Sequence, residues 1–556
     1  MIRRSRFGSP YPPGLMRQPE SRVEIFDPTR GFHSGEPPQD LPPGMTPAAR
    51  NFVVDGGYLT PRSGLSQFGA YSLGEAVLGG GEVFDSSGHP NAIVFSSGTV
   101  AYYERNAASW SALSYIEDAS LGAPDTFSGE TNSYAQHAAI YDPASDKNAV
   151  IFCNNLINYP KIAYLHDSLA TYSDYTAPFS LLSKAKSVAA FDNRLLFFHT
   201  QDGSTAKPTR IVWSARGNPN SFNVIDGGGA EDLLDMRGSG QKVVAEKDSL
   251  LLFSDEEIWR ARPRGDAYAF DFYPVAQQRG GPYPQTIVNT PFGTAFLGRD
   301  LEVYVVSGQD VLPLGPRRPG SPSRINRELR STLTRPDRAW GLYNQEQHRY
   351  ELYYTTSSAT SGYPNRALFF HFENGAWMPQ HYQHELTYGF EMEAGSLPLS
   401  WDEIEATWDQ MNLTWDGDNS AGFGRNITTF GSAGTVYTFR SDQTTDDTTA
   451  IDCRWRSHAL NSRDQLRFDQ LYEVNIEAEV PSASSLSVMV SDDLGASFLD
   501  GFNINLSASS ITNAFAPVWV TARAPQFEIR LNDGGTPKIA RMQARLRDTG
   551  LYGGGA

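Results

Sequence analysis

The sequence predicts an all-β fold, in which a β-propeller of about six or seven blades is followed by a β-sandwich-like C-terminal domain. Glycine and proline are abundant, with 50 and 35 of the 556 residues, and the chain holds 26 Tyr and 31 Phe. This composition is rich in turn formers and in residues that favour strands. Short apolar runs bounded by Gly, Asn, Asp or Pro recur in pairs about every 40–55 residues. The recurrence favours propeller blades, although a chain of β-sandwiches would give similar local signals.

Residues 1–48 are expected to form an extended, proline-rich arm. Prolines occur throughout this segment, and proline both fixes φ and removes a hydrogen-bond donor. Neither a helix nor a central strand is therefore expected here. The arm is interpreted either as a segment that lies on a neighbouring subunit or as a disordered tail.

Residues 49–395 are expected to form the propeller. At its start, Asn51–Leu59 reads NFVVDGGYL, and the Asp-Gly-Gly sequence supplies the positive φ of a hairpin turn. Further strands are expected at apolar runs along this region, which include 91–96, 99–103, 149–153, 194–199, 249–253, 294–297, 350–354 and 367–372.

Residues 396–430 are interpreted as a linker that carries a Trp-Asp repeat. Trp401, Trp408 and Trp415 recur at a spacing of seven, and each is followed by Asp. This spacing would place three indoles on one helix face, or each indole could lie in a short turn of its own. The three tryptophans are candidate interaction or packing residues, and an exposed row of them would suit a carbohydrate ligand.

Residues 431–556 are expected to form the β-sandwich-like domain, which ends in a glycine-rich tail. Apolar or alternating runs at 470–477, 486–490, 518–520 and 527–531 predict its strands. Residues 491–498 read SDDLGASF and fit the pattern S-x-D-x-G-x-[ST]-[WF], which resembles the Asp-box of sialidases and related β proteins. The resemblance implies a structural hairpin turn, formed by Ser491, Asp493, Gly495, Ser497 and Phe498.

Seven arginines are concentrated in one segment of a chain whose net charge is −17. Guanidinium groups bind carboxylates and phosphates well. The segment is therefore a candidate for contact with an acidic partner or with a DNA backbone, and an ordinary solvated loop is the alternative. The arginines are Arg317, Arg318, Arg324, Arg327, Arg330, Arg335 and Arg338.

Charge and motifs argue against several classes of protein. The net charge of −17 and the pI near 5.1 oppose nucleic-acid binding as the main role. The sequence lacks an apolar run of about 18 residues, so no membrane span is expected. It also lacks GxSxG, HExxH, GxGxxG and P-loop motifs. These absences leave an α/β-hydrolase nucleophile, a HExxH zinc site and nucleotide binding without support, and no metal site is expected.

Three stretches carry a family resemblance. Asn51–Gly64 reads NFVVDGGYLTPRSG and Arg210–Phe222 reads RIVWSARGNPNSF. Leu250–Trp259 reads LLLFSDEEIW and is followed by Gly280-Gly281-Pro282 and by TAFLGRD at 294–300. These stretches are similar to elements of the tail nozzle proteins of short-tailed phages, a family that includes packaged-DNA stabilisation (tail tubular) proteins. The resemblance covers most of residues 50–545.

The resemblance implies a structural virion protein of the phage tail, present in the host cytoplasm during assembly. It implies no catalytic residues and no cofactor, so the protein is predicted not to be an enzyme. Such proteins usually form a homohexameric ring below the portal and adaptor proteins. The implied partners are other copies of the chain, the portal and adaptor, tail fibre or spike proteins, and double-stranded DNA in transient, non-specific contact within the lumen. The ring would retain packaged DNA and let it pass on ejection, and an acidic wall would repel phosphate.

Two alternatives remain open from the residues alone. A receptor- or glycan-binding tail protein would present the tryptophan row to a sugar. A propeller glycoside hydrolase would place two carboxylates about 5–10 Å apart at the centre of the propeller.

Overall fold

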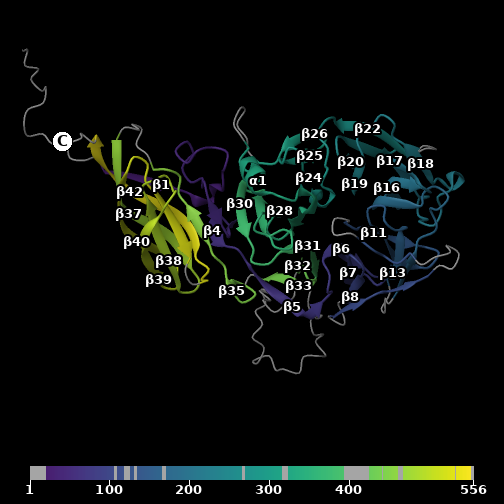
Figure 1. Ribbon diagram of the computed structural model, residues 1–556, viewed down its shortest axis with the longest axis horizontal. Helices are drawn as coiled ribbons and strands as arrows, with labels where there is room; N and C mark the ends of the chain where they lie inside the picture. The colour runs from purple at the N-terminus through teal and green to yellow at the C-terminus, as the bar shows by residue number, and fades with distance from the viewer. Residues whose placement is uncertain are drawn as a thin grey trace, which may run out of the picture. The chain divides into compact units, whose positions relative to one another are not determined.

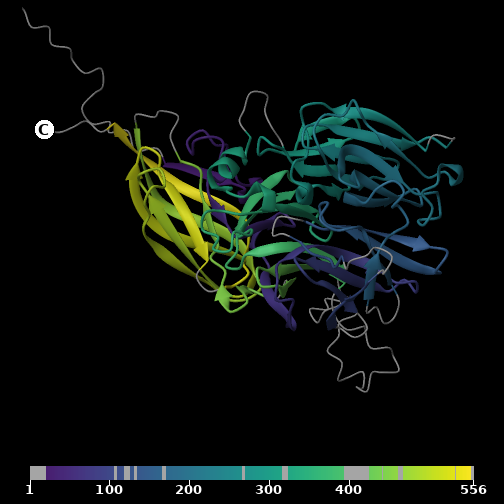
Figure 2. The ribbon, with the colours of Figure 1, turned by 45° about the vertical axis from the view of Figure 1, so that its right-hand side comes forward.

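The computed structural model describes residues 21–104, 109–117, 125–129, 134–165, 171–265, 269–315, 323–393, 425–440, 443–460, 467–531 and 534–551. Strands dominate this part of the chain, which divides into two compact units (Figures 1 and 2). Unit 1 comprises Met1–Ala49, Val54–Pro61 and Asp452–Ala556. Unit 2 comprises Arg50–Val53 and Arg62–Ile451.

Unit 2 is a β-propeller, and its described residues form seven blades of antiparallel sheet. Figure 1 shows the sheets succeeding one another around a ring. Blade one consists of β6 (Val77–Phe84), β7 (Pro90–Ser96), β8 (Val100–Glu104) and β9 (Ser109–Ala112). Blade two consists of β11 (Gln136–Asp142), β12 (Lys147–Cys153), β13 (Lys161–Leu165) and β14 (Thr171–Asp174), with β10 (Ser114–Ile116) parallel to β14. Blade three consists of β15 (Lys184–Phe191), β16 (Arg194–Asp202), β17 (Thr205–Trp213) and β18 (Gly229–Asp232).

Blades four to seven follow the same plan. Blade four consists of β19 (Gly240–Ala245), β20 (Leu250–Ser254), β21 (Ile258–Pro263) and β22 (Phe270–Ala276), and blade five of β23 (Val288–Thr290), β24 (Gly293–Leu297), β25 (Val303–Ser307) and β26 (Asp310–Pro313). Blade six consists of β27 (Trp340–Asn344), β28 (Arg349–Tyr354), β29 (Arg366–His371) and β30 (Ala376–His381). Blade seven consists of β31 (Leu386–Glu393), β32 (Arg425–Gly431), β33 (Thr435–Arg440) and β5 (Gly64–Ser72), with β34 (Thr445–Asp446) and β35 (Thr449–Ala450) beyond β5. Short helical segments join some of these strands, namely η3 (Val224–Asp226), η4 (Pro284–Thr286), α1 (Asn326–Thr332) and η5 (Pro336–Arg338).

The last blade closes the ring by combining the two ends of unit 2. Its strands β31, β32 and β33 come from the end of the unit, and β5 comes from the beginning and pairs antiparallel with β33. In Figure 1 the purple β5 accordingly lies beside the green β33. Closure of this kind leaves a propeller with only short sheet edges. The prediction of an all-β propeller of about six or seven blades is therefore confirmed.

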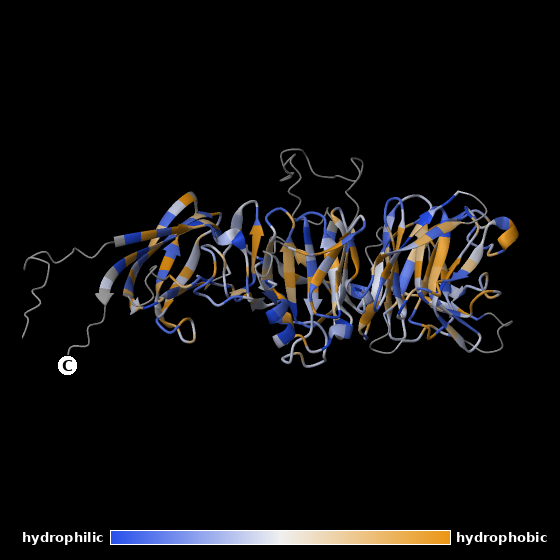
Figure 3. Cartoon of the chain, turned by 90° about the horizontal axis from the view of Figure 1, so that it is seen from above, coloured by the Kyte–Doolittle hydropathy of each residue, from blue (hydrophilic) through white to orange (hydrophobic). Residues whose placement is uncertain are grey.

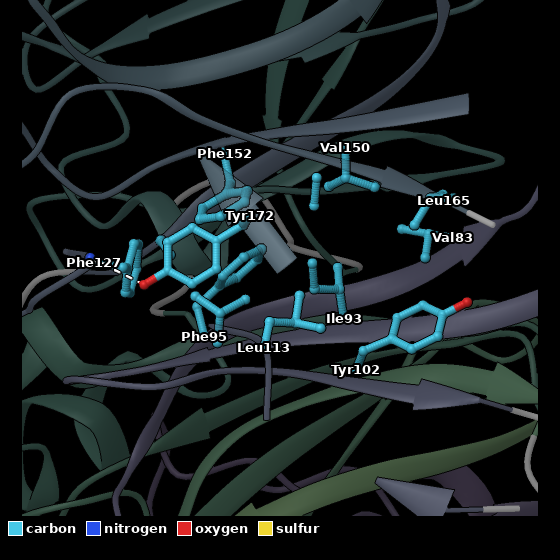
Figure 4. Packing of buried hydrophobic residues seen from close by; sticks show 13 residues of the cluster. Val83, Ile93, Phe95, Tyr102, Leu113, Phe127, Val150, Phe152, Leu165 and Tyr172 are labelled. Atoms are coloured by element: carbon cyan, nitrogen blue, oxygen red, sulfur yellow. Dashed lines mark hydrogen bonds between the residues drawn. The ribbon is translucent and has the colours of Figure 1, made fainter. Parts of the chain in front are cut away.

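Apolar side chains between neighbouring blades form the cores of unit 2. Between blades one and two, Phe95 and Phe152 are fully buried with ring centroids 4.6 Å apart (Figure 4). The Tyr172 hydroxyl accepts a hydrogen bond from the Phe127 backbone N–H at 3.3 Å, so the polar tip of this tyrosine is satisfied. Burial of each such side chain contributes roughly 1.5–3 kcal/mol. Figure 3 shows the corresponding concentration of apolar residues on the strands.

Unit 1 is a β-sandwich of two sheets. One contains β3 (Phe52–Asp55), β4 (Tyr58–Pro61), β42 (Lys538–Leu551), β37 (Arg467–Val480) and β40 (Ser509–Ala522), with β1 (Ser21–Phe26) also paired to β42; the other contains β2 (Ala49–Arg50), β36 (Arg454–Arg456), β41 (Gln526–Leu531), β38 (Ser484–Ser491) and β39 (Leu499–Leu506). The sheets face each other, because Phe26 of the first stacks on Trp455 of the second at 6.0 Å. The sandwich-like C-terminal domain is thus confirmed.

The described part of the predicted proline-rich arm contains a strand that pairs within the same chain. Residues 21–26 form β1, which pairs with β42 over its whole length within the same chain. The stretch SRVEIF contains no proline and alternates in polarity, so every N–H is able to join the ladder. The turn η1 (Pro28–Arg30) follows. Residues 1–20 lie outside the described part.

The predicted boundaries after residue 395 also differ from the structure. The sequence places 431–556 in the C-terminal domain, whereas unit 2 extends to Ile451. β32 and β33 pair with each other and with strands of the last blade. Their alternating polarity is the same pattern that predicts sandwich strands, so local sequence does not separate the two domains. The glycine-rich tail lies outside the described residues.

A buried guanidinium fastens the start of β5. Arg62 Nη1 donates to Asp446 Oδ1 at 2.8 Å, Nη2 donates to the other carboxylate oxygen, and both side chains are only 2% exposed. Nη2 also donates to the His381 carbonyl at 3.0 Å, and Nε donates to Asn51 Oδ1 at 3.2 Å. The guanidinium lies 4.3 Å from the Tyr382 ring centroid. Arg62 therefore ties blade seven to the last strand of blade six.

Replacement of Arg62 by alanine should lower the free energy of unfolding by about 3–5 kcal/mol, because it leaves the Asp446 carboxylate buried without its partner. Urea unfolding followed by circular dichroism would measure the loss. Arg335→Ala is the matched control, since Arg335 forms a surface ion pair with Asp337 and is 41% exposed. The control should change stability by no more than about 1 kcal/mol; equal losses in the two variants would contradict the role given to Arg62.

Candidate functional site

The arginine segment is divided between structural and exposed side chains. Arg338 is buried, donates to the Gly362 carbonyl at 2.8 Å and lies over the Tyr363 ring at 4.4 Å. Arg324 donates to the Gly375 carbonyl at 3.1 Å. These two guanidinium groups fasten loops of blade six to its strands.

The other described arginines are more accessible. Arg335 forms two hydrogen bonds to the Asp337 carboxylate, at 3.2 and 3.0 Å. Arg327 and Arg330 are exposed on the short helix α1, and Arg330 Nη2 reaches the Asp300 carbonyl at 3.5 Å. Contact of these side chains with an acidic partner or with DNA stays a prediction. Arg317 and Arg318, like Trp401, Trp408 and Trp415, lie outside the described residues.

The predicted Asp-box turn joins β38 to β39. Asp493 accepts from the Ser497 N–H at 2.9 Å and from the Ser497 hydroxyl at 2.6 Å. The Ser491 hydroxyl donates to Asp493 at 2.7 Å and accepts from the Gly495 N–H at 2.9 Å. These bonds, led by the one from the Ser497 hydroxyl, lower the pKa of Asp493. Gly495 has φ +82°, and Arg456 lies 4.6 Å from the half-buried Phe498 ring. The turn therefore has a structural role.

A pocket of about 630 Å³ lies on the axis of the propeller. It is lined by the first strands of blades two to seven, so the ring itself brings its residues together. Its polar lining residues come from different blades and include Gln136, His137, Lys242, Gln285, Asn289, Tyr343, Gln345, Tyr388 and Glu391.

Burial changes the acidity of two lining residues. Desolvation lowers the pKa of Lys242 to about 8, and its Nζ donates to the Ile287 carbonyl at 2.8 Å. Desolvation, and secondarily the Lys242 charge, lowers the pKa of His137 to about 4. At neutral pH the pocket therefore holds a neutral imidazole beside a mostly protonated amine. Such a pair suits recognition of a hydrogen-bonding or anionic group.

Three successive glycines in β6 make this axial packing possible. A Cβ at Gly79 would lie 2.3 Å from the Ala135 carbonyl oxygen, and one at Gly81 would lie 2.6 Å from His137 Cε1. A Cβ at Gly79 would collide with backbone, and one at Gly81 would require the His137 ring to shift, so glycine at these positions allows β6 to lie this close to β11. The signal was present in the sequence, because glycine within a strand pattern indicates close backbone approach.

Several described apolar side chains are exposed, and two groups of them, one in each unit, are considered as interaction surfaces. In unit 1, β40 turns alternate residues outward, and Ile511, Phe515 and Trp519 are 69%, 53% and 69% exposed. The intervening core-facing residues are smaller, Ala514, Ala516, Val518 and Val520. The outward face of this strand is thus more aromatic than its buried face, which is the reverse of an ordinary surface strand and typical of an interaction surface.

The second exposed apolar surface is the tip formed by η3 in unit 2. Val224 and Ile225 are 77% and 90% exposed. The tip is held firmly, because Asn223 Oδ1 accepts from the Ile225 N–H at 3.0 Å and Arg194 donates to the Gly227 carbonyl at 2.6 Å. These hydrogen bonds fix the turn in the conformation that exposes Val224 and Ile225.

The described residues contain neither a cluster of metal ligands nor a membrane-spanning helix. No group of three or more His, Cys, Asp or Glu side chains is placed there to hold a metal ion. Within the same residues, no helix is long and apolar enough to cross a membrane.

Comparison with known proteins gives likeness of structure alone. No family model and no curated protein matches the chain. The chain is similar to an exo-β-1,3-galactanase from Phanerochaete chrysosporium at 10% identity and TM-score 0.25, over 74% of this chain and 100% of that one. It is similar to BamB from Moraxella catarrhalis at 9% identity and TM-score 0.35, over 70% and 95%. It is also similar to YCF48 from Cyanidioschyzon merolae at 8% identity and TM-score 0.39, over 68% and 99%.

The prediction that the protein is not an enzyme is contradicted by this comparison and is withdrawn. The similar structures include glycoside hydrolases, such as the galactanase. The physical reason is that fold and reaction are independent, since one architecture carries many chemistries. Missing sequence motifs therefore do not exclude catalysis. At these TM-scores the likeness assigns no reaction to the chain.

Acidification should destabilise the protein through His137. Its folded pKa of about 4 lies below the ordinary value of 6.5, so the unfolded chain binds the proton more readily between these values. The stabilisation is complete above pH 6.5 and declines as the pH falls toward 4. Between pH 7 and pH 5, wild type should lose about 1–2 kcal/mol more than His137→Gln, with allowance for the partial exposure of the ring.

Urea unfolding at the two pH values measures this difference. Gln345→Asn, which changes a lining residue that does not titrate, serves as the control and should retain the wild-type pH dependence. An identical pH dependence in wild type and His137→Gln would show that the imidazole contributes nothing.

Proposed function

We propose that this chain is a structural protein of a phage tail, which assembles into a ring-shaped nozzle that retains packaged DNA and lets it pass on ejection. The observation that carries the proposal is the inverted outward face of β40, with Ile511, Phe515 and Trp519 exposed. A soluble monomer gains nothing from aromatic side chains on such a face, whereas an assembled subunit buries them.

The two apolar surfaces suit cyclic assembly in particular. A ring is built from heterologous contacts, in which each subunit uses two different surfaces. The β40 face and the η3 tip supply one such surface in each unit. The tip lies within the loop that follows the stretch Arg210–Phe222, which resembles the tail nozzle family.

The stretches that carry the family resemblance have structural roles in the propeller. Asn51 and Arg62 belong to the network around Asp446. Arg210 forms a bidentate pair with Asp232 at 2.6 and 2.9 Å, and Phe222 is buried. These residues therefore stabilise the propeller, the fold that the resemblance implies. The net charge of −17 agrees with a conduit, because an acidic wall weakens adhesion of phosphate.

The proposed partners are other copies of the chain, the portal and adaptor proteins above the ring, and tail fibre or spike proteins. DNA would touch the lumen transiently and without sequence preference. The proposed location is the virion tail, with assembly in the host cytoplasm.

Mass photometry of the full chain, alone and mixed with the portal–adaptor complex of the same virion, tests this function. We expect a discrete species of about six copies, either alone or on the complex. The double variant Phe515→Ser/Trp519→Ser should lose this species, because the buried aromatic area is removed. Asn513→Ser, on the same outward face, is the matched control and should assemble normally. A chain that stays monomeric and ignores the complex would overturn the proposal.

A further inference from the structure

A second pocket, of about 700 Å³, lies between blades four and five of unit 2. It is bounded by the turn between β19 and β20, the end of β21 and the hairpin of β23 and β24. Its volume is in the range of ordinary small-molecule sites. Nine of its thirteen lining residues are polar or charged, and they come from three separate segments of the chain.

Arg260 on β21 is the central feature of this pocket. The residue is only 5% exposed, yet it lies on the blade face that turns toward blade five, opposite Leu251. In the part of the chain that the structure describes, its Nε and Nη2 have no hydrogen-bond acceptor. These two N–H groups lie along one edge of the guanidinium plane, which is the edge that binds two oxygens of a carboxylate or phosphate.

The neighbouring carboxylate does not satisfy this edge. Glu246 Oε2 lies 3.1 Å from Arg260 Nη2 as an ion pair, but the approach lacks hydrogen-bond geometry and leaves Nε without an acceptor. Glu246 also faces two hydroxyls, those of Ser249 at 3.2 Å and Thr294 at 3.3 Å. The carboxylate is therefore shared among several donors, and a buried polar N–H without an acceptor is costly.

Further positive charge surrounds the same space. Arg262 follows two residues after Arg260 on β21, and Lys247 lies in the β19–β20 turn. Three cationic side chains thus line the pocket against two acidic ones, Glu246 and Asp248. This is a local excess of positive charge in a chain whose net charge is −17.

We propose that this pocket binds an oxyanion, a carboxylate or phosphate group of a small molecule, on the Nε–Nη2 edge of Arg260. Both N–H groups are shielded from solvent, so the incoming group reaches this edge when Glu246 moves aside toward Ser249. Glu246 therefore competes with the ligand for Arg260. Asn289 and the hydroxyls of the pocket are then available to polar substituents of the ligand. The site is separate from the proposed ring contacts and does not depend on them.

Isothermal titration calorimetry on the full chain tests the site with three probes: inorganic phosphate, glucuronate and neutral glucose. Either anion should bind with a Kd of about 0.1–10 mM, and glucose should not bind. Tighter binding of phosphate would identify the ligand as a phosphate compound, and tighter binding of glucuronate as a sugar acid; both support the oxyanion site. Equal binding of glucose, or no binding of either anion, would overturn it.

Two variants locate the binding. Arg260→Lys keeps the positive charge but removes the pair of N–H donors at Nε and Nη2. It should weaken anion binding at least about tenfold. Glu246→Gln removes the competing carboxylate and should strengthen it several-fold, an effect that general loss of structure would not produce. Arg264→Gln is the matched control, because Arg264 pairs with Asp271 outside the pocket and should bind as wild type does. Weaker binding in Glu246→Gln, or a loss in Arg264→Gln equal to that in Arg260→Lys, would contradict the site.

Discussion

The pairing of β5 with β33 is the constraint on which the rest of the propeller depends. Each blade packs only against its neighbours, so the ring holds its shape only when the first and last segments are joined. Arg62 stands directly before β5 and binds Asp446, His381 and Asn51 at once. A buried ion pair of this kind adds little to stability in itself, but its disruption is costly because a charge is left without a partner. The axial pocket exists only in the closed ring.

Much of the fold could be predicted because its signals are local. Alternating runs, Asp-Gly-Gly turns and the recurrence of strand pairs all act over short stretches. The closing strand could not be assigned in this way, since β5 and β33 are far apart in sequence and meet only in the ring. The same limit explains the misplaced boundary after residue 430. The strands β32 and β33 alternate like those of a sandwich, and only their partners identify them as part of the propeller.

The candidate sites also differ in whether local sequence could predict them. The Asp-box turn was predictable because Ser491, Asp493 and Ser497 bond to each other and to the adjacent backbone. The arginine segment was not, because the acceptors of Arg324 and Arg338 are carbonyls from other loops. His137 and Lys242 have no motif between them, and ring geometry alone places both in the axial pocket. The glycine run in β6 indicates close backbone approach, but its residues do not line that pocket.

The negative net charge of the chain suits the proposed conduit, and the local positive charge at Arg260 suits the proposed anion site. A conduit has to avoid holding DNA, and an acidic chain achieves this because repulsion of phosphate acts at the range of the Debye length. Arg260 acts at contact distance, within a concave site whose walls are turns of two blades. A phosphate that is part of a duplex cannot be enclosed by such a pocket without deformation of the DNA, whereas a small anion enters whole. In the proposed site the local positive charge would select for ligand size as well as for sign, and is compatible with the proposed conduit.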